Sequence, residues 1–218
     1  MNGQFIRGIL MEDKQSFIAE ARREQIIQAC IDTLDEYGYT NVSLTKVAKK
    51  AKVSTGLISY HFSGKMDLIN QTLLYLLNKK LDFISGKVVQ EETSISQLKA
   101  YIEASLAYQV AHYKNNIALI EIVFNAKNEE GVPYYKADDD EEDLLNALLK
   151  DILLEGRKRQ EFSNEFDVEM MCILIQGAIE ESMLYQNKSF SFEKYKDELT
   201  RMITKIVMQK QKDYFHIN

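Results

Sequence analysis

One stretch of the sequence, residues 43–65, concentrates side chains that could contact a nucleic acid. It contains five lysines, and no acidic residue occurs between Glu36 and Asp67. Lysines neutralise phosphates, while hydroxyls and flat rings can contact phosphates and bases. A lysine run is in most proteins a solvated helix face, but here it coincides with a capped helix-turn-helix pattern and with small polar and aromatic residues on the second helix. The candidate DNA-contacting residues are Ser43, Thr45, Lys46, Lys52, Ser54, Thr55, Gly56, Ser59, Tyr60, His61 and Lys65.

Different members of this set are suited to different contacts. Lys65 stands at the expected start of a helix, where the helix dipole would add to its charge in holding a phosphate. Thr45 is a second candidate for a phosphate contact. We expect Thr55, Ser59 and Tyr60 to face bases or the adjacent backbone.

A second group of residues could line a pocket for a small molecule. Gln176 and Glu180 are one helical turn apart in an otherwise apolar segment, where a buried carboxylate is costly unless it is paired. Glu180 could lie at the surface, pair with a lysine, or select a cationic or hydrogen-bonding ligand. Apolar walls with a few polar groups are typical of ligand pockets, although the same residues could simply be core. The candidates are Tyr108, His112, Phe124, Met171, Gln176, Glu180 and Met183.

The sequence offers no positive support for catalysis, a metal site or a cofactor. Only His112 among the histidines could serve either role, and no other ligand residue stands at a suitable spacing on its helix. No nucleophile-elbow, Walker or dinucleotide-binding pattern occurs. Cys30 and Cys172 both lie in apolar surroundings, so we expect two small core residues rather than a disulfide or a redox sensor.

Two short helices joined by a turn would position residues 43–65. Ser43 and Ser54 can each cap the first turn of a helix, because a serine hydroxyl accepts a free backbone N–H there. Lys52 and Val53 form the turn, and the second helix is expected at Thr55–His61. The apolar residues of the first helix share one face at helical spacing. They are Leu44, Val47, Ala48 and Ala51.

The remaining apolar periodicity predicts an all-α fold of about nine helices. One proline and nine glycines in 218 residues leave little sequence for loops. Asn115-Asn116 are expected to separate two helices, and the acidic run at residues 138–143 is expected at a helix N-terminus rather than at a metal. The other helices are expected at Ala19–Tyr37, Lys65–Gly86, Ile95–Lys114, Ile117–Ala126, Leu144–Gly156, Val168–Asn187 and Phe192–Lys212.

The charge of the chain is divided unevenly. Residues 1–65 carry nine Lys or Arg against seven Asp or Glu, a net +2, whereas the whole chain carries -6 and the remainder therefore -8. Phosphate would repel the remainder, which argues against indiscriminate nucleic-acid binding. No segment is long and apolar enough to span a membrane, and the N-terminal apolar residues are too few for a signal peptide. We therefore expect a cytoplasmic protein.

The segment V-S-T-G-L-I-S-Y-H-F-S-G-K resembles the recognition-helix signature of the tetracycline-repressor (TetR) family of bacterial transcription regulators. The preceding R-E-Q-I-I-Q-A-C-I-D-T-L-D-E-Y-G-Y is similar to that family's first helix. The close resemblance covers Arg22 to Leu77. Its fixed positions are Gly38, Ala48, Ala51, Val53, Ser54, Gly56, Phe62 and Lys65.

Two positions depart from the family pattern. Lys52 stands where the family usually has glycine, so a turn that needs positive φ would bear strain of roughly 1 kcal/mol or adopt a different geometry. Ser59 stands where the family often has a phosphate-contacting tyrosine, and Tyr60 and His61 could carry that contact instead.

The resemblance implies a two-domain transcription regulator, with the N-terminal three-helix domain binding DNA. We expect a flexible arm at residues 1–18, the helix-turn-helix domain at 19–64, a connecting helix at 65–86, and a helical effector-binding and dimerisation domain at 87–218. The last two helices of each subunit would form a four-helix homodimer interface. Such a dimer would bind an inverted-repeat operator as a repressor and be released by a small-molecule effector. The alternative is a regulator of the same fold that answers to a protein partner.

Overall fold

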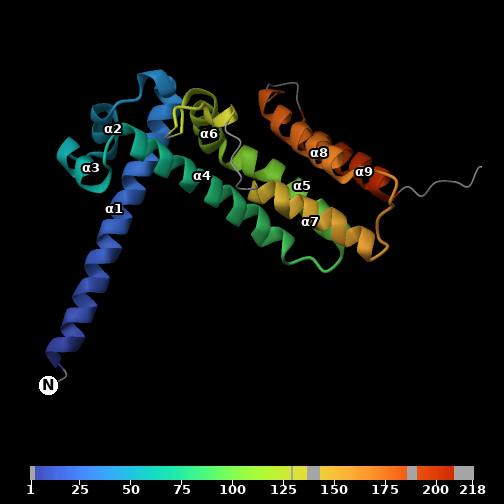
Figure 1. The fold of residues 1–218 in the computed structure, drawn as a ribbon, viewed down its shortest axis with the longest axis horizontal. Helices are drawn as coiled ribbons and strands as arrows, with labels where there is room; N and C mark the ends of the chain where they lie inside the picture. The colour runs from blue at the N-terminus through green and yellow to red at the C-terminus, as the bar shows by residue number, and fades with distance from the viewer. Residues whose placement is uncertain (1–2, 129, 137–142, 186–190, 209–218) are drawn as a thin grey trace, which may run out of the picture. The chain divides into compact units, whose positions relative to one another are not determined.

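The computed structural model describes residues 3–128, 130–136, 143–185 and 191–208, and these residues form the all-α fold predicted from the sequence (Figure 1). They contain nine α-helices and two short 3-10 helices, at Tyr134–Lys136 and Met183–Tyr185. The α-helices are α1 (Gly3–Asn41), α2 (Leu44–Ala51), α3 (Thr55–His61), α4 (Lys65–Val88), α5 (Ser94–Ala111), α6 (Tyr113–Asn125), α7 (Leu144–Lys158), α8 (Val168–Ser182) and α9 (Phe192–Met208).

The chain divides into two compact units, and the division differs from the expected domain boundaries. The first unit comprises residues 1–77 and 114–138, and the second comprises residues 78–113 and 139–218. The helix α6, which we expected in the effector domain, belongs to the first unit. The reason is apolar burial, because Ala118 and Ile122 of α6, and Ala126 just after it, lie fully inside the core of the first unit.

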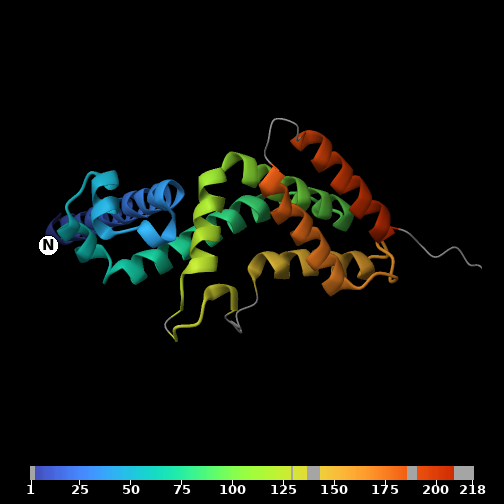
Figure 2. The same ribbon diagram turned by 90° about the horizontal axis from the view of Figure 1, so that it is seen from above.

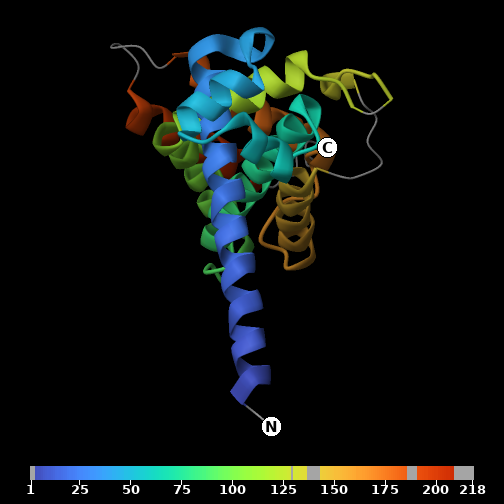
Figure 3. The same cartoon turned by 90° about the vertical axis from the view of Figure 1, so that its left-hand side faces the viewer.

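The first helix is longer than expected. Residues 3–18, which we expected to form a flexible arm, are the first turns of α1. The sequence contains no glycine or proline between Gly8 and Gly38, so nothing in that interval interrupts a helix. Figure 3 shows the N-terminal half of α1 extending away from α2 and α3. Gly38, the expected end of the first helix, has non-helical angles (φ 69°, ψ 166°) and marks a kink.

Two side chains of α1 hold the helix-turn-helix in place. The guanidinium of Arg23 donates to the carbonyl of His61 at 3.1 Å and lies 5.0 Å from the centroid of the Phe62 ring. The amide of Gln25 donates to the carbonyl of Ala51, the last residue of α2, at 2.8 Å. Phe62 itself is buried, as predicted. The ends of α2 and α3 are thus fixed to a common support by hydrogen bonds to their carbonyls.

The helix α6 and the loop after it are bound to the same unit by polar contacts. The Glu121 carboxylate accepts a hydrogen bond from the backbone N–H of Tyr39 at 2.8 Å, next to the kink at Gly38. The Tyr134 hydroxyl donates to Asn70 on α4 at 2.7 Å. These contacts connect α6 with the segment that leads into the helix-turn-helix.

The core of the second unit is built around α5. Its fully buried residues Leu98, Ile102 and Leu106 pack with apolar side chains of α7, α8 and α9. Figure 2 shows α5 between α7 and α9. The buried Gln109 donates to the carbonyl of Ile179 on α8 at 2.9 Å, which ties α5 to α8.

Several helix ends differ from the expected positions. The break between α5 and α6 lies at His112 rather than at Asn115-Asn116, because Asn116 is buried within α6. The α-helix α8 ends at Ser182. Asp143 caps α7, and its Oδ1 accepts from the N–H of Leu145 at 3.0 Å. The rest of the acidic run and the chain after residue 208 lie outside the described residues.

Candidate DNA-binding surface and ligand cavity

The helix-turn-helix has the two predicted serine caps. The Ser43 hydroxyl accepts from the N–H of Lys46 at 3.3 Å, and the Ser54 hydroxyl accepts from the N–H of Leu57 at 3.1 Å. The apolar side of α2 and α3 is buried in the core of the first unit. The polar side chains of α2 and α3 therefore face outward, as the sequence pattern predicts, and are available to bind another molecule.

The turn between α2 and α3 uses a left-handed residue. Lys52 has φ 55° and ψ 43°, and its N–H donates to the carbonyl of Lys49 at 3.3 Å. The N–H of Val53 donates to the carbonyl of Ala48 at 3.0 Å, which closes the end of α2 in the way typical of a left-handed helix cap. The turn at Lys52 therefore has positive φ, and it does not avoid the strain by adopting a different geometry.

Most of the predicted DNA-contacting residues, on α2, on α3 and at the start of α4, are exposed. Ser43, His61 and Lys65 are partly buried, and the remaining members of the set are exposed. Tyr60 is 80% exposed, and its ring meets the ring of His61 edge to face at 5.0 Å between centroids. The high exposure matters, because an aromatic ring that is mostly in contact with solvent is available to a base or a sugar.

Two lysines of this surface are held by neighbouring tyrosines. Lys46 Nζ donates to the carbonyl of Asn41 at 2.8 Å and lies 4.4 Å from the centroid of the Tyr37 ring. Lys65 Nζ donates to the carbonyl of Tyr39 at 3.4 Å and lies 5.0 Å from the centroid of that ring. An ammonium has three donors. Each lysine can therefore keep its contact within the protein and still donate to a phosphate.

The predicted ligand-binding residues are not all brought together. Gln176 and Glu180 do line one cavity in the second unit. Tyr108 and His112 instead form an aromatic cluster with Phe83, in which the rings of Tyr108 and His112 are 4.5 Å apart. None of these three rings lines the cavity.

The other three predicted ligand contacts are also placed elsewhere. Met171 and Met183 are buried side chains that do not reach the cavity. Phe124 belongs to the first unit, is 61% exposed and stacks on Tyr135 with centroids 5.7 Å apart. The apolar side chains of α6 that enter the core are those on its other face, which is why Phe124 remains outside.

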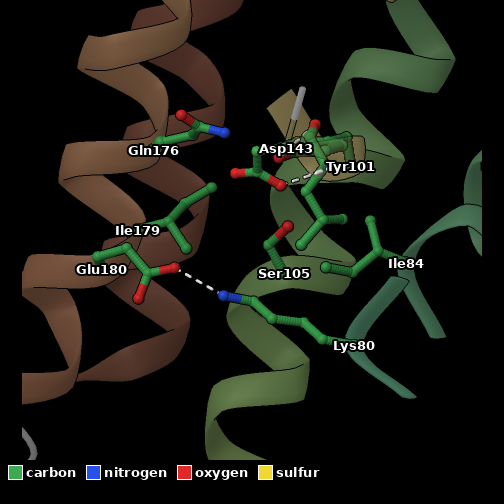
Figure 4. A pocket seen from close by; sticks show the side chains of 9 residues that line it. Lys80, Ile84, Tyr101, Ser105, Asp143, Gln176, Ile179 and Glu180 are labelled. Atoms are coloured by element: carbon green, nitrogen blue, oxygen red, sulfur yellow. Dashed lines mark hydrogen bonds and ion pairs between the residues drawn. The ribbon is translucent and has the colours of Figure 1, made fainter. Parts of the chain in front are cut away.

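The cavity has a volume of about 150 Å³ and four helices supply its walls (Figure 4). Side chains of α8 point across it toward those of α4 and α5, and the start of α7 closes another side. The lining residues are Lys80 and Ile84 of α4, Tyr101 and Ser105 of α5, Asp143 and Leu145 at the start of α7, and Gln176, Ile179 and Glu180 of α8.

A buried cation distinguishes this cavity from ordinary core. Lys80 Nζ donates to Glu180 Oε1 at 2.7 Å, yet the Lys80 side chain is 8% exposed and that of Glu180 is 54% exposed. The buried Ser105 hydroxyl has no hydrogen-bond partner among the described residues. The Tyr101 hydroxyl donates to the carbonyl of Leu145 at 3.3 Å, and burial raises the pKa of Tyr101.

Lys80, Tyr101 and Ser105 line the cavity but were not among the predicted ligand contacts. For Lys80, the sequence does contain a pattern that indicates a special role. Lys80 lies four residues after Leu76 and four before Ile84, both of which are buried. A lysine in the middle of a buried helical stripe needs a partner or a ligand, because an unpaired buried charge is costly. The partner of Lys80 is Glu180. Glu180 therefore pairs with a lysine and also lines a pocket, two alternatives that the sequence had left open.

Both cysteines behave as core residues. Burial raises the pKa of the Cys30 and Cys172 thiols to about 11. Among the described residues, no group of three or more His, Cys, Asp or Glu side chains is arranged to hold a metal. Nor does any helix in the described ranges combine the length and apolar character needed to cross a bilayer.

The family model for bacterial regulatory proteins of the tetR family matches residues 26–72. A segment of 85 residues is 32% identical to the HTH-type transcriptional regulator BetI 1 of Chromohalobacter salexigens, covering 38% of this chain and 42% of that protein. A segment of 58 residues is 38% identical to BetI of Paraburkholderia phytofirmans, covering 27% of this chain and 30% of that protein. The chain thus spans less than half the length of these curated relatives.

Solved structures resemble the fold over most of the chain. The fatty acid degradation regulator FadR of Bacillus halodurans superposes with a TM-score of 0.70 at 20% identity, over 84% of this chain and 94% of that one. The regulator FadR of Bacillus subtilis, solved with stearoyl-CoA, gives 0.70 at 18% identity, over 84% and 98% of the two chains. Taken with the capped helix-turn-helix, the match identifies residues 26–72 as a segment of the type found in the tetR family of bacterial regulatory proteins.

Proposed function

We propose that this protein is a transcription repressor that binds an inverted-repeat operator as a homodimer and is released by a small molecule. The observation that carries the DNA-binding part is the exposed polar face of α3, held by a doubly capped helix-turn-helix in a tetR-family segment. Recognition helices of this kind enter the major groove and contact base edges with their N-terminal residues.

Exposed apolar side chains on α8 and α9 support the homodimer. Met170, Ile173 and Leu174 follow one stripe of α8 and are each about half exposed or more. Met202 and Ile206 follow a stripe of α9 and are 51% and 40% exposed. An apolar stripe of this size is costly in water and is typical of protein interfaces. A C2 dimer would bury both stripes against their symmetry mates and place two recognition helices in successive major grooves.

The cavity of the second unit supports control by a small molecule. The helix α4 begins directly after the helix-turn-helix and supplies Lys80 and Ile84 to the cavity wall. A ligand that favours one position of α4 would therefore favour one arrangement of the recognition helices, and a coupling of about 1–3 kcal/mol would weaken DNA binding roughly 5–150-fold. The alternative is control by a protein partner. That alternative would not explain why the buried Lys80 and the Ser105 hydroxyl face a cavity.

Selection of bound DNA from a random pool tests this function. The purified full chain is expected to enrich an inverted repeat, whose half-sites lie about 34–36 Å apart or a multiple of that distance along the duplex. Enrichment of no sequence at low salt would contradict the proposal. The selected repeat then serves as the probe for screening compounds that release the protein.

A further inference from the structure

The cavity lined by Lys80 and Ser105 contains groups that the protein itself leaves incompletely satisfied. Lys80 is a buried ammonium whose counter-ion, Glu180, is more than half exposed. The hydroxyl of Ser105 is buried and finds no hydrogen-bond partner in the part of the chain that the structure describes. A buried hydroxyl without a partner is unfavourable. Ser94 and Thr200 also have such hydroxyls, but of the three only that of Ser105 lies at the wall of the cavity, where a ligand could accept its hydrogen bond.

The burial of the charges indicates the sign of that partner. The cation is inside, whereas Asp143 and Glu180, the two carboxylates, are exposed to water. Exposed charges are screened and attract a ligand weakly, while a buried charge acts in a lower dielectric and attracts its counter-ion strongly. The inner end of the cavity therefore favours an anion over a cation.

Glu180 already marks the position that such an anion would take. Its carboxylate oxygen lies 2.7 Å from Lys80 Nζ, the distance of a charge-assisted hydrogen bond. Because the Glu180 side chain is mostly in water, it can turn outward and be solvated at little cost. An incoming carboxylate would then replace it on Lys80 and gain a second hydrogen bond from Ser105.

The size and the remaining walls of the cavity indicate the rest of the ligand. Ile84, Leu145 and Ile179 provide apolar surface beside the polar groups. A volume of about 150 Å³ is similar to that of cavities that hold a single aromatic ring, which corresponds to roughly five to nine non-hydrogen atoms. A long acyl chain with a nucleotide carrier does not fit in this volume.

We propose that the cavity binds a small monocarboxylate with a short apolar tail, whose carboxylate takes the place of Glu180 on the Lys80 ammonium. This inference rests on the proposed function in treating the cavity as the effector site, and it specifies the chemical class of the effector. The tail lies against Ile84, Leu145 and Ile179, and the Ser105 hydroxyl donates to the bound carboxylate.

Isothermal titration of the full chain with acetate, butyrate, hexanoate, octanoate and benzoate tests the ligand class. Each methylene added from acetate onward should tighten binding about fourfold until the cavity is filled. Hexanamide and hexylamine, which have a similar tail without the negative charge, should bind at least tenfold more weakly than hexanoate. Failure of every acid at millimolar concentration, or tighter binding of hexylamine, would overturn the proposal.

Variants of the two charged residues give effects of opposite direction. Lys80→Met should weaken hexanoate binding about 10–100-fold, because it removes the charged donor. Lys87→Met, on the same helix and exposed, is the matched control and should leave binding unchanged. Glu180→Gln should tighten hexanoate binding about two- to tenfold, because it removes the competing carboxylate. Weaker binding by Glu180→Gln would contradict the exchange.

The Ser105→Ala variant separates ligand binding from stability. Since the hydroxyl is unpartnered in the free protein, its removal should leave the melting temperature of the free protein unchanged or raise it. The same change should weaken hexanoate binding about fivefold. A lower melting temperature with unchanged affinity would assign the hydroxyl a structural role. These titrations contain no DNA, so they fail independently of the operator selection that tests the proposed function.

Discussion

Lys52 occupies the left-handed turn between α2 and α3, a conformation that costs most residues with a side chain roughly 1 kcal/mol. Glycine adopts this conformation without that cost, so Lys52→Gly is expected to raise the free energy of unfolding by about 0.5–1 kcal/mol. Gln160, with φ 60°, is a matched site outside the DNA-binding unit, and Gln160→Gly should have an effect of the same sign. Urea denaturation of both variants measures the change. A loss of stability in both would show that neither turn is strained.

The two thiols provide a second prediction at this scale. Because burial raises the pKa of Cys30 and Cys172 to about 11, both remain protonated at pH 8 and are poor nucleophiles. A colorimetric thiol reagent at pH 8 should react with neither cysteine in the folded protein and with both after denaturation in guanidinium chloride. Rapid labelling of the native protein would contradict the core assignment and suggest a redox role instead.

Individual residues were predictable where a local rule applies. The caps at Ser43 and Ser54 follow from the affinity of a serine hydroxyl for free N–H groups, and each makes the expected hydrogen bond. The cavity was predicted only at Gln176 and Glu180, because its other polar members lie on helices distant in sequence. Which rings and methionines reach a cavity depends on how helices rotate against one another, and a single helix pattern does not contain that information.

At the scale of elements, α7 depends on a close approach between Gly156 and Phe162. A Cβ at position 156 would lie 2.1 Å from Cδ2 of the buried Phe162 ring, so the ring would have to move. Gly156→Ala is therefore expected to lower the free energy of unfolding by about 1–3 kcal/mol. Gly86→Ala is the control, because its Cβ meets nothing within 4 Å and alanine favours the helix. Equal effects in thermal unfolding of the two variants would contradict this role for Gly156.

The order and type of the elements were predictable, whereas their grouping was not. Apolar periodicity and caps give α2 to α5 and α7 to α9 within a few residues of their observed starts. The assignment of α6 to the DNA-binding unit depends on tertiary contacts, namely the burial of Ala118 and Ile122 and the bond from Tyr39 to Glu121. Nothing in the local sequence of α6 specifies which of the two cores its apolar face joins.

A substitution in the exposed apolar stripe of α8 tests whether the molecule is a dimer. Ile173 is 63% exposed, so Ile173→Glu should leave the fold intact and break the interface by placing two buried charges on the symmetry axis or near it. Ile203 is unsuitable for this test because it is fully buried in the core of its own subunit. Analytical ultracentrifugation at micromolar concentration should give a dimer for the wild type and a monomer for the variant.

Two outcomes of the ultracentrifugation experiment would contradict the proposed dimer interface. A stable wild-type monomer would contradict the dimer, and a dimer of Ile173→Glu would place the interface elsewhere. Gln97→Glu, on a half-buried position of α5 that lies outside both stripes, is a control for the added charge and should remain dimeric.

Fluorescence anisotropy over a range of salt concentrations measures the affinity of the protein for the selected operator duplex and tests whether α3 is the recognition helix. For the wild type, log K should fall linearly with log salt, as expected when lysines displace counter-ions from phosphates. Tyr60→Ala should weaken operator binding by about 1–3 kcal/mol. Tyr185→Ala, which changes a half-exposed tyrosine of the second unit, should leave operator binding unchanged. Equal operator affinity for wild type and Tyr60→Ala across all salt concentrations would contradict the claim that α3 is the recognition helix.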